Sequence, residues 1–163
     1  MRSLALTALC ILALLAPLPA AGQMSFGPQL SFGTDSDFGI GARLVFPLRT
    51  EALGLDGVID GNYFFPGDEA GTNVDWLDGN VNVRMPIPLA EQFQTRIGAG
   101  LNVTQVTFDA GGESNSNTEV GLNLLGNLEF PRGAFTPFGE FRVILGGAEQ
   151  VVLTGGFTLG GRD

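Results

Sequence analysis

The feature that most constrains the fold is a period-two alternation of side-chain character, repeated in eight short segments of the chain. In each segment one set of alternate residues is uncharged and largely apolar, and the charges that the segments contain all lie in the other set, which is otherwise mostly polar or glycine. Successive side chains of a β-strand point to opposite faces, so this alternation predicts strands with one apolar and one polar face. The predicted strands are 24–33, 38–47, 55–65, 77–87, 93–104, 119–130, 135–145 and 151–159.

The polar face of these predicted strands is rich in ionisable residues. Its charged members are Arg43, Asp56, Asp60, Asp78, Arg84, Arg96, Glu119, Glu129, Glu140 and Arg142. In a soluble sandwich or barrel the apolar face points inward and the charges face water. A wide apolar face can be outermost when the sheet closes into a barrel surrounded by hydrocarbon. The sequence therefore predicts an all-β protein, an eight-stranded antiparallel up-and-down transmembrane β-barrel with its charges inside.

The first residues have the composition of a secretory signal peptide. Met1 and Arg2 form a minimal positive region, residues 4–15 are apolar, and small residues follow over 17–23. The apolar run is too short to span a bilayer. We expect cleavage before Gln23, with Ala21 as a near alternative, so the predicted organisation is a signal peptide over 1–22 and one barrel domain over 23–163.

The connections between the predicted strands alternate in character. The odd ones, over 34–37, 66–76, 109–118 and 146–150, are polar, and the even ones are tighter. If the mature N-terminus lies in the periplasm, all odd connections are extracellular. Their acidic residues include Asp35, Asp37, Asp68, Glu69 and Glu113. Such carboxylates could collect calcium, but solvated loop acids are the usual case, so we expect no metal.

Aromatic residues gather toward the ends of the segments, as in the two interfacial girdles of a membrane barrel. The predicted outer girdle is Phe32, Phe38, Tyr63, Phe65, Trp76 and Phe108, and the inner one is Phe26, Phe46, Phe93, Phe130, Phe135 and Phe157. The alternation slips after Thr104, where Val106 and Phe108 are apolar on the polar side, which predicts a bulge or the start of a loop. Pro28 and Pro137 fall within strands although proline lacks the ladder donor.

The composition excludes most enzyme chemistry. The chain has no histidine and no lysine, and its one cysteine, Cys10, lies in the predicted signal peptide. Ser-His and Cys-His nucleophiles, imidazole or thiolate metal sites and a P-loop are thereby excluded. Paired interior carboxylates could serve as acid and base. However, side chains fill an eight-stranded barrel and buried charges need partners, so we expect an ion-paired plug, no enzyme and no cofactor. A net charge of −9 argues against nucleic acid as a partner.

The signal peptide, the eight amphipathic strands and the run Phe138-Gly139-Glu140-Phe141-Arg142 before a last strand at 151–159 resemble the bacterial outer-membrane β-barrel domain family, in the size class of OmpA/OmpX-type barrels. This resemblance implies a monomer in the cell outer membrane, in contact with membrane lipid and lipopolysaccharide. It also implies insertion by the outer-membrane assembly machinery, whose usual signal is a terminal aromatic residue. Here Phe157 and Leu159 keep the alternation, but four further residues follow.

Three hypotheses follow for function, because a shared fold does not define a shared role. The leading one is a non-enzymatic outer-membrane barrel with a plugged interior and a structural or surface-interaction role through its extracellular loops. The second is a secreted or periplasmic lipocalin-like barrel that carries an apolar small molecule, which would require an apolar interior. The third is a narrow porin-like channel, which would require an open lumen.

Overall fold

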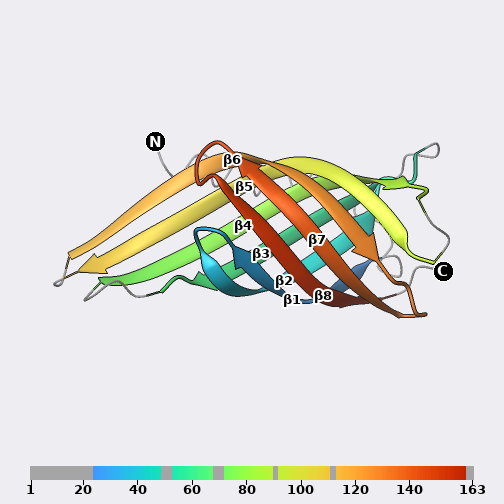
Figure 1. Ribbon diagram of the computed structural model, residues 1–163, viewed down its shortest axis with the longest axis horizontal. Coiled ribbons are helices and arrows are strands. Elements are labelled where there is room, and N and C mark those ends of the chain that lie inside the picture. Colours follow the sequence, from blue (N-terminus) through green and yellow to red (C-terminus); the bar gives the residue numbers. More distant parts are fainter. Residues whose placement is uncertain (1–23, 49–52, 68–71, 90–91, 111–112, 161–163) are drawn as a thin grey trace.

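The eight predicted strands form a closed antiparallel barrel (Figure 1). The computed structural model describes residues 24–48, 53–67, 72–89, 92–110 and 113–160. The strands are β1 (Ser25–Gly33), β2 (Asp37–Pro47), β3 (Asp56–Phe65), β4 (Thr72–Ile87), β5 (Gln94–Ala110), β6 (Glu113–Glu129), β7 (Phe135–Leu145) and β8 (Gln150–Leu159). Each strand pairs with the next, and β1 pairs with β8, from Phe26 opposite Leu159 to Gly33 opposite Val152. This confirms the predicted fold class.

The alternation has the predicted orientation, with the apolar residues outside and the charges inside. On β6, Leu122 is 57% exposed while the adjacent Asn123 is completely buried. All four arginines of the predicted polar face are buried within the barrel, and large apolar side chains such as Phe26 and Leu30 are exposed on the outer wall. Within the described ranges, no helix is long and apolar enough to cross a membrane.

The odd connections lie together at one end of the barrel, which we call the outer end, and the even ones lie at the inner end. Aromatic pairs occur at both ends of the outer wall. Near the outer end, the rings of Phe38 and Phe65 are 6.4 Å apart and those of Tyr63 and Phe65 are 5.0 Å apart. Near the inner end the ring pairs are Phe93 with Phe130 and Phe135 with Phe157. Aromatic residues on the outer wall therefore gather at both ends of the barrel, and the pairs at the outer end lie on β2 and β3.

Three strands are longer than the sequence predicted. The expectation that 66–76 and 109–118 are connections is wrong, because β4 begins at Thr72 and β5 and β6 pair without interruption up to Ala110 opposite Glu113. The expected bulge after Thr104 is also absent, since pairing with both neighbouring strands continues through it. Backbone pairing does not need an apolar face, so a polar segment can prolong a ladder that already exists.

We call the prolonged parts of these strands the outer extension, comprising residues 72–75 of β4, 105–110 of β5 and 113–118 of β6. In Figure 1 these strands project beyond the remaining ones at the left of the barrel. β3 pairs with β4 only as far as Phe64 opposite Trp76, and β7 pairs with β6 only from Leu145 opposite Leu122. The outer extension is therefore a three-stranded sheet that is not part of the closed wall.

Two of the prolines inside strands, Pro28 and Pro137, have different effects on the wall. Pro28 lies opposite Ala42 in the continuous pairing of β1 with β2, but the pairing of β1 with β8 is interrupted between Phe26 and Gln29. The missing amide donor of Pro28 accounts for this gap. Pro137 lies opposite Phe157 without an interruption, and its carbonyl accepts a hydrogen bond from the Phe130 amide at 2.9 Å.

Two strand glycines give a matched test of how tightly the wall and interior are packed. A Cβ on Gly100 would lie 2.1 Å from the Val81 carbonyl oxygen and 2.4 Å from the Asn82 Oδ1, whereas a Cβ on Gly139 would meet nothing within 4 Å. We therefore expect Gly100→Ala to lower the free energy of unfolding by about 1 to 3 kcal/mol through overpacking. Gly139→Ala should change it by less than about 0.5 kcal/mol. Urea titrations of both variants in lipid vesicles would measure this difference, and equal stabilities would contradict the described packing.

The outward orientation of Leu122 predicts a large effect of a charge at this position. Leu122→Arg should prevent assembly or lower the free energy of unfolding in vesicles by about 2 to 4 kcal/mol, because the guanidinium would enter hydrocarbon. Leu122→Phe, which keeps the position apolar, is the matched control. A Leu122→Arg protein as stable as the control would show that this face does not contact lipid.

Candidate functional site in the barrel interior

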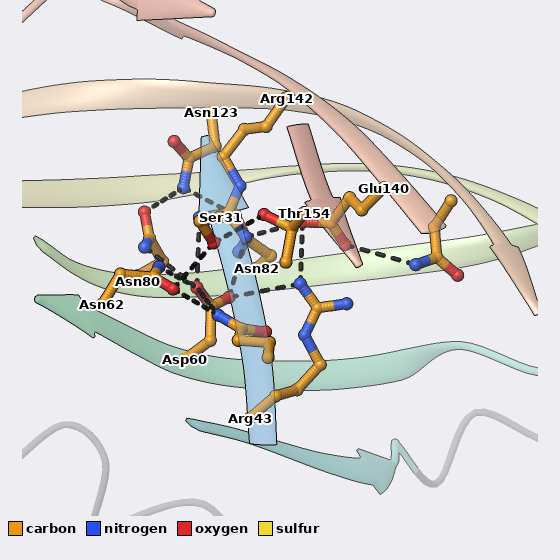
Figure 2. Close-up of polar contacts among 12 residues, drawn as sticks. Ser31, Arg43, Asp60, Asn62, Asn80, Asn82, Asn123, Glu140, Arg142 and Thr154 are labelled. Carbon is orange, nitrogen blue, oxygen red and sulfur yellow. Dashed lines mark hydrogen bonds and ion pairs between the residues drawn. The ribbon is translucent and has the colours of Figure 1, made fainter. Parts of the chain in front are cut away.

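Two groups of four charged side chains occupy the lumen. The middle quartet consists of Arg43, Asp60, Glu140 and Arg142, which come from β2, β3 and β7 and are at least 96% buried. Arg142 donates to both Asp60 oxygens, at 3.1 and 2.8 Å, and its Nη2 lies 2.6 Å from the Glu140 Oε1. Arg43 reaches the same Glu140 oxygen at 2.8 Å and lies 3.9 Å from Asp60. Figure 2 shows these side chains converging across the lumen.

The inner quartet, nearer the inner end, consists of Asp56, Arg84, Arg96 and Glu129 from the consecutive strands β3 to β6. Arg84 lies 2.9 Å from Glu129 and 3.5 Å from Asp56. Arg96 lies 2.8 Å from Asp56 and 3.3 Å from Glu129. Each quartet thus contains two arginines and two carboxylates, and every arginine approaches both acids. With two charges of each sign, each quartet is neutral as a unit. The pairing within it offsets the cost of removing these charges from water.

Uncharged polar side chains continue the network toward the outer end. Asn80 donates to Asp60 at 3.0 Å, and its own Oδ1 accepts hydrogen bonds from Asn102 and Asn123, each at 3.0 Å. Toward β1, Asn62 accepts hydrogen bonds from Gln29 at 2.7 Å and from Ser31 at 2.9 Å. Figure 2 shows several of these amides around the middle quartet. Because buried polar groups must be hydrogen-bonded, this connected set holds the interior side chains in defined positions.

The lumen also contains apolar side chains, which were not among the predicted interior residues. Phe64, Ile144 and Val152 form a buried cluster toward the outer end, and Trp76 packs against it. Val45, Val58, Leu125 and Phe138 are also buried on the inward face. The Arg43 guanidinium lies 4.3 Å from the centre of the Phe138 ring, an arrangement that favours a cation–π interaction. These buried apolar residues occupy inward positions in the sequence as well, but the charged residues on the same face dominated the prediction.

Eight of the ten predicted interior charges belong to the two quartets, and two do not. Asp78 is buried, but it accepts hydrogen bonds from Thr104 at 2.6 Å and from the Trp76 indole at 3.2 Å instead of joining a quartet. Glu119 lies where β6 leaves the closed wall and accepts a hydrogen bond from Asn117 at 2.8 Å. Its assignment to the interior network is therefore wrong, because β6 extends beyond the lumen at that level.

Two members of the predicted outer girdle also lie elsewhere. Trp76 is on the inward face of β4, in contact with the buried apolar cluster. Phe108 is on the same face of β5 as Asn102 and Thr104 and is exposed on the outer extension. Both expectations rested on the position of each residue along the chain, whereas the strand face of each depends on how far β4 and β5 extend.

The predicted loop acids have several different placements. Asp35 is exposed in the turn between β1 and β2. Asp37 is the first residue of β2 rather than a loop residue, and its Oδ2 accepts a hydrogen bond from the Gly67 amide at 3.0 Å, which joins two connections of the outer end. Glu113 is the first residue of β6, so its loop assignment is wrong. Asp68 and Glu69 lie outside the described residues.

The geometry of the interior is that of a structural plug. The carboxylates of Asp60 and Glu140 are each approached by two arginines, so neither is positioned to act as a free acid or base on a substrate. Among the described residues, no group of three or more histidine, cysteine, aspartate or glutamate side chains could hold a metal ion. The lumen is filled by hydrogen-bonded and ion-paired side chains, as expected for an eight-stranded barrel.

The closed eight-stranded wall, its apolar exterior and its ion-paired interior define the fold as that of a small outer-membrane-type β-barrel. The chain is similar to the attachment invasion locus protein Ail of Yersinia pestis, with 15% identity and a TM-score of 0.63 over 83% of this chain and 93% of Ail. It is also similar to Neisserial surface protein A, NspA, with 14% identity and a TM-score of 0.60 over 83% of this chain and 94% of NspA.

A third similar structure is the N-terminal β-barrel domain of Pseudomonas aeruginosa OprF, with 10% identity and a TM-score of 0.62 over 85% of this chain and 98% of that domain. No family model matches the sequence, and none of the curated proteins matches it. These likenesses establish the fold of the chain, and its role has to be argued from its own residues.

The middle quartet predicts a strong dependence of stability on Arg142. Arg142→Met should lower the free energy of unfolding by about 3 to 5 kcal/mol, because Asp60 and Glu140 would lose a shared partner inside the barrel. The exposed Arg132 at the inner end provides a control, since Arg132→Met should change stability by less than about 0.5 kcal/mol. Urea titrations in vesicles would measure both values. A silent Arg142→Met would mean that the quartet contributes nothing to folding.

Proposed function

We propose that this protein is a non-enzymatic integral outer-membrane β-barrel whose interior is a stabilising plug and whose role is structural or depends on contacts at its outer end. The observation that carries the proposal is the pairing of an apolar outer wall with a charged, ion-paired lumen in a closed barrel. Exposure of such an apolar outer wall is unfavourable in water and favourable in the hydrocarbon core of a bilayer.

The proposal includes the route to the membrane. A signal peptide over 1–22 would direct export, and the barrel domain over 23–163 would be inserted by the outer-membrane assembly machinery. Its surroundings would then be membrane lipid and lipopolysaccharide, with the protein present as a monomer. Of the eight arginines, none lies within 33–37, 66–76, 105–118 or 146–150, the outer-end segments. Any attraction to anionic lipid headgroups at the outer surface would therefore require other groups or bridging cations.

The interior argues against the two alternative functions. A lipocalin-like carrier needs an apolar cavity for its ligand, but the middle of this lumen holds two arginines and two carboxylates within ion-pair distance of one another. A narrow channel needs an open path for water, but the buried Phe64, Ile144 and Val152 occupy the lumen toward its outer end. Both features support a closed, plugged barrel.

A surface role is supported by the outer extension, which closure of the barrel does not require. It carries the exposed residues Asp75 and Asp109 and the aromatic Phe108 beyond the closed wall. The names of two proteins with a similar fold, an attachment invasion protein and a surface protein, agree with such a role. We infer that this chain also meets its partners through its outer end.

The decisive test of the membrane assignment is heat-modifiable electrophoretic migration. The chain 23–163, refolded into detergent micelles, should migrate differently before and after boiling, and its β-rich circular dichroism should require detergent. The ion-paired lumen also predicts no steady conductance in planar bilayers. Folding in plain buffer without a migration shift would overturn the membrane assignment, and a steady open current would replace the plugged barrel by a channel.

A further inference from the structure

The edge of β6 in the outer extension lacks a neighbouring strand on one side. β5 pairs with β6 over its whole length, from Glu113 to Glu129, but β7 pairs with β6 only from Leu122 onward. The turn between β7 and β8 approaches the lower part of this edge, since a Cβ on Gly147 would lie 3.0 Å from the Val120 carbonyl oxygen. Among the described residues, no strand pairs with the side of residues 114–118 that faces away from β5, and we call this segment the free edge.

The free edge has few of the devices that normally prevent strand addition. Exposed edges are usually protected by proline, by lysine, by a bulge or by a covering segment. Residues 114–118, with the sequence Ser-Asn-Ser-Asn-Thr, contain neither proline nor lysine, and their pairing with β5 is regular. All five residues are exposed. The backbone groups on the open side are therefore accessible, and the short side chains leave room for an additional strand.

The charges around the free edge are of one sign. Asp75 and Asp109 are exposed on the neighbouring strands of the outer extension, and Glu119 follows the free edge on β6 itself. Across the barrel mouth, Asp35 and Glu149 are also exposed in turns of the outer end. Because no arginine or lysine lies in any outer-end segment, the field at this end attracts a positively charged partner.

We propose that the free edge of β6 binds an extended, basic segment of a partner protein by strand addition. This inference rests on the proposed function, which places the outer extension outside the membrane. Main-chain hydrogen bonds along 114–118 would supply the part of the affinity that does not depend on the partner's sequence. Side chains at alternate positions would supply selectivity. A lysine or arginine at the end of the partner segment nearest Glu119, which adjoins the free edge, would form an ion pair with this carboxylate.

A second copy of this chain fits the free edge less well. Two barrels in one membrane are related by an axis along the membrane normal, so their β6 strands would run parallel and place the same acidic surface on both sides of the contact. Like charges facing each other across a strand pair are destabilising. The charge at the outer end thus favours a basic partner over self-association.

The experiment uses the refolded chain 23–163 in detergent micelles and synthetic nine-residue peptides of alternating threonine and valine. The basic peptide has lysine at both ends and the matched acidic peptide has glutamate. At millimolar basic peptide, amide hydrogen exchange followed by NMR should slow at least tenfold at alternate residues of 114–118, and the acidic peptide should have less effect. Equal protection by both peptides would overturn the choice of a basic partner.

Backbone methylation of the basic peptide tests strand addition directly. In a strand, the amides at alternate positions point to the same side, so N-methylation of one alternate set should abolish the protection and N-methylation of the other set should retain it. If both methylated peptides protect equally, or if protection spreads over the whole barrel, the binding is not strand addition and the proposal is wrong. Protection of 114–118 that rises with protein concentration without peptide would instead indicate self-association.

Two variants separate the local charge from the general charge of the outer end. Glu119→Gln removes the carboxylate next to the free edge, and Asp35→Asn removes one from an exposed turn elsewhere on the outer end. Glu119→Gln should weaken binding of the basic peptide about threefold, as for an exposed ion pair, and Asp35→Asn should weaken it less. Equal effects would overturn the proposed pairing with Glu119.

The migration shift on boiling distinguishes failure of this inference from failure of the proposed function. A protein that shows the shift but no protection at 114–118 would retain its assignment as a membrane barrel and lose the proposed docking edge. A protein that shows no shift would lose both, because the outer extension would then have no membrane from which to project.

Discussion

Closure of the sheet by the pairing of β1 with β8 is the constraint on which the rest of this structure depends. In hydrocarbon no water can satisfy backbone amides and carbonyls, so an open sheet edge at membrane depth is excluded. In a closed barrel one face of every strand fills the lumen and the other forms the outer wall, which the proposed function places against lipid. The exposed Leu122 and the buried Asn123 on β6 are adjacent examples of the two environments. The period-two alternation of the sequence is therefore a direct consequence of closure.

Closure also explains why the interior charges form quartets rather than isolated pairs. The lumen of an eight-stranded barrel is narrow, so side chains from opposite walls meet, as Arg142 of β7 and Asp60 of β3 do. An arginine has several donors, and a single carboxylate inside the lumen leaves some of them without an acidic partner. Two acids shared between two arginines give each guanidinium a second partner, and the resulting unit is neutral. Such a unit fixes the relative positions of several strands at once.

The sequence predicted the strand number, the closed fold and the inward face because apolar residues alternate with polar ones in the strands, and in six of the eight the polar set includes charges. It did not predict the true lengths of β4, β5 and β6, because residues 114–118 are polar on both faces and show no alternation. The ion-pair partners could not be predicted either, since Asp60 and Arg142 are brought together only by closure. Glu119 and Trp76 were misplaced for a related reason: Glu119 lies at the level where β6 leaves the closed wall, and Trp76 belongs to the inward face of a strand that begins earlier than predicted.

The unequal strand lengths separate what the membrane requires from what it does not. β1, β3 and β8 have 9, 10 and 10 residues, close to the length needed to cross the apolar core of a bilayer, whereas β5 and β6 have 17 each. The additional residues contribute backbone hydrogen bonds to one another but bury no lipid-facing surface, and they leave edges on both sides of a three-stranded sheet. Closure of the barrel does not pair the backbone groups along these two edges. The outer extension is thus the part of the fold whose shape the bilayer leaves unconstrained, so its polar surface and its acidity are best understood through contacts made in water.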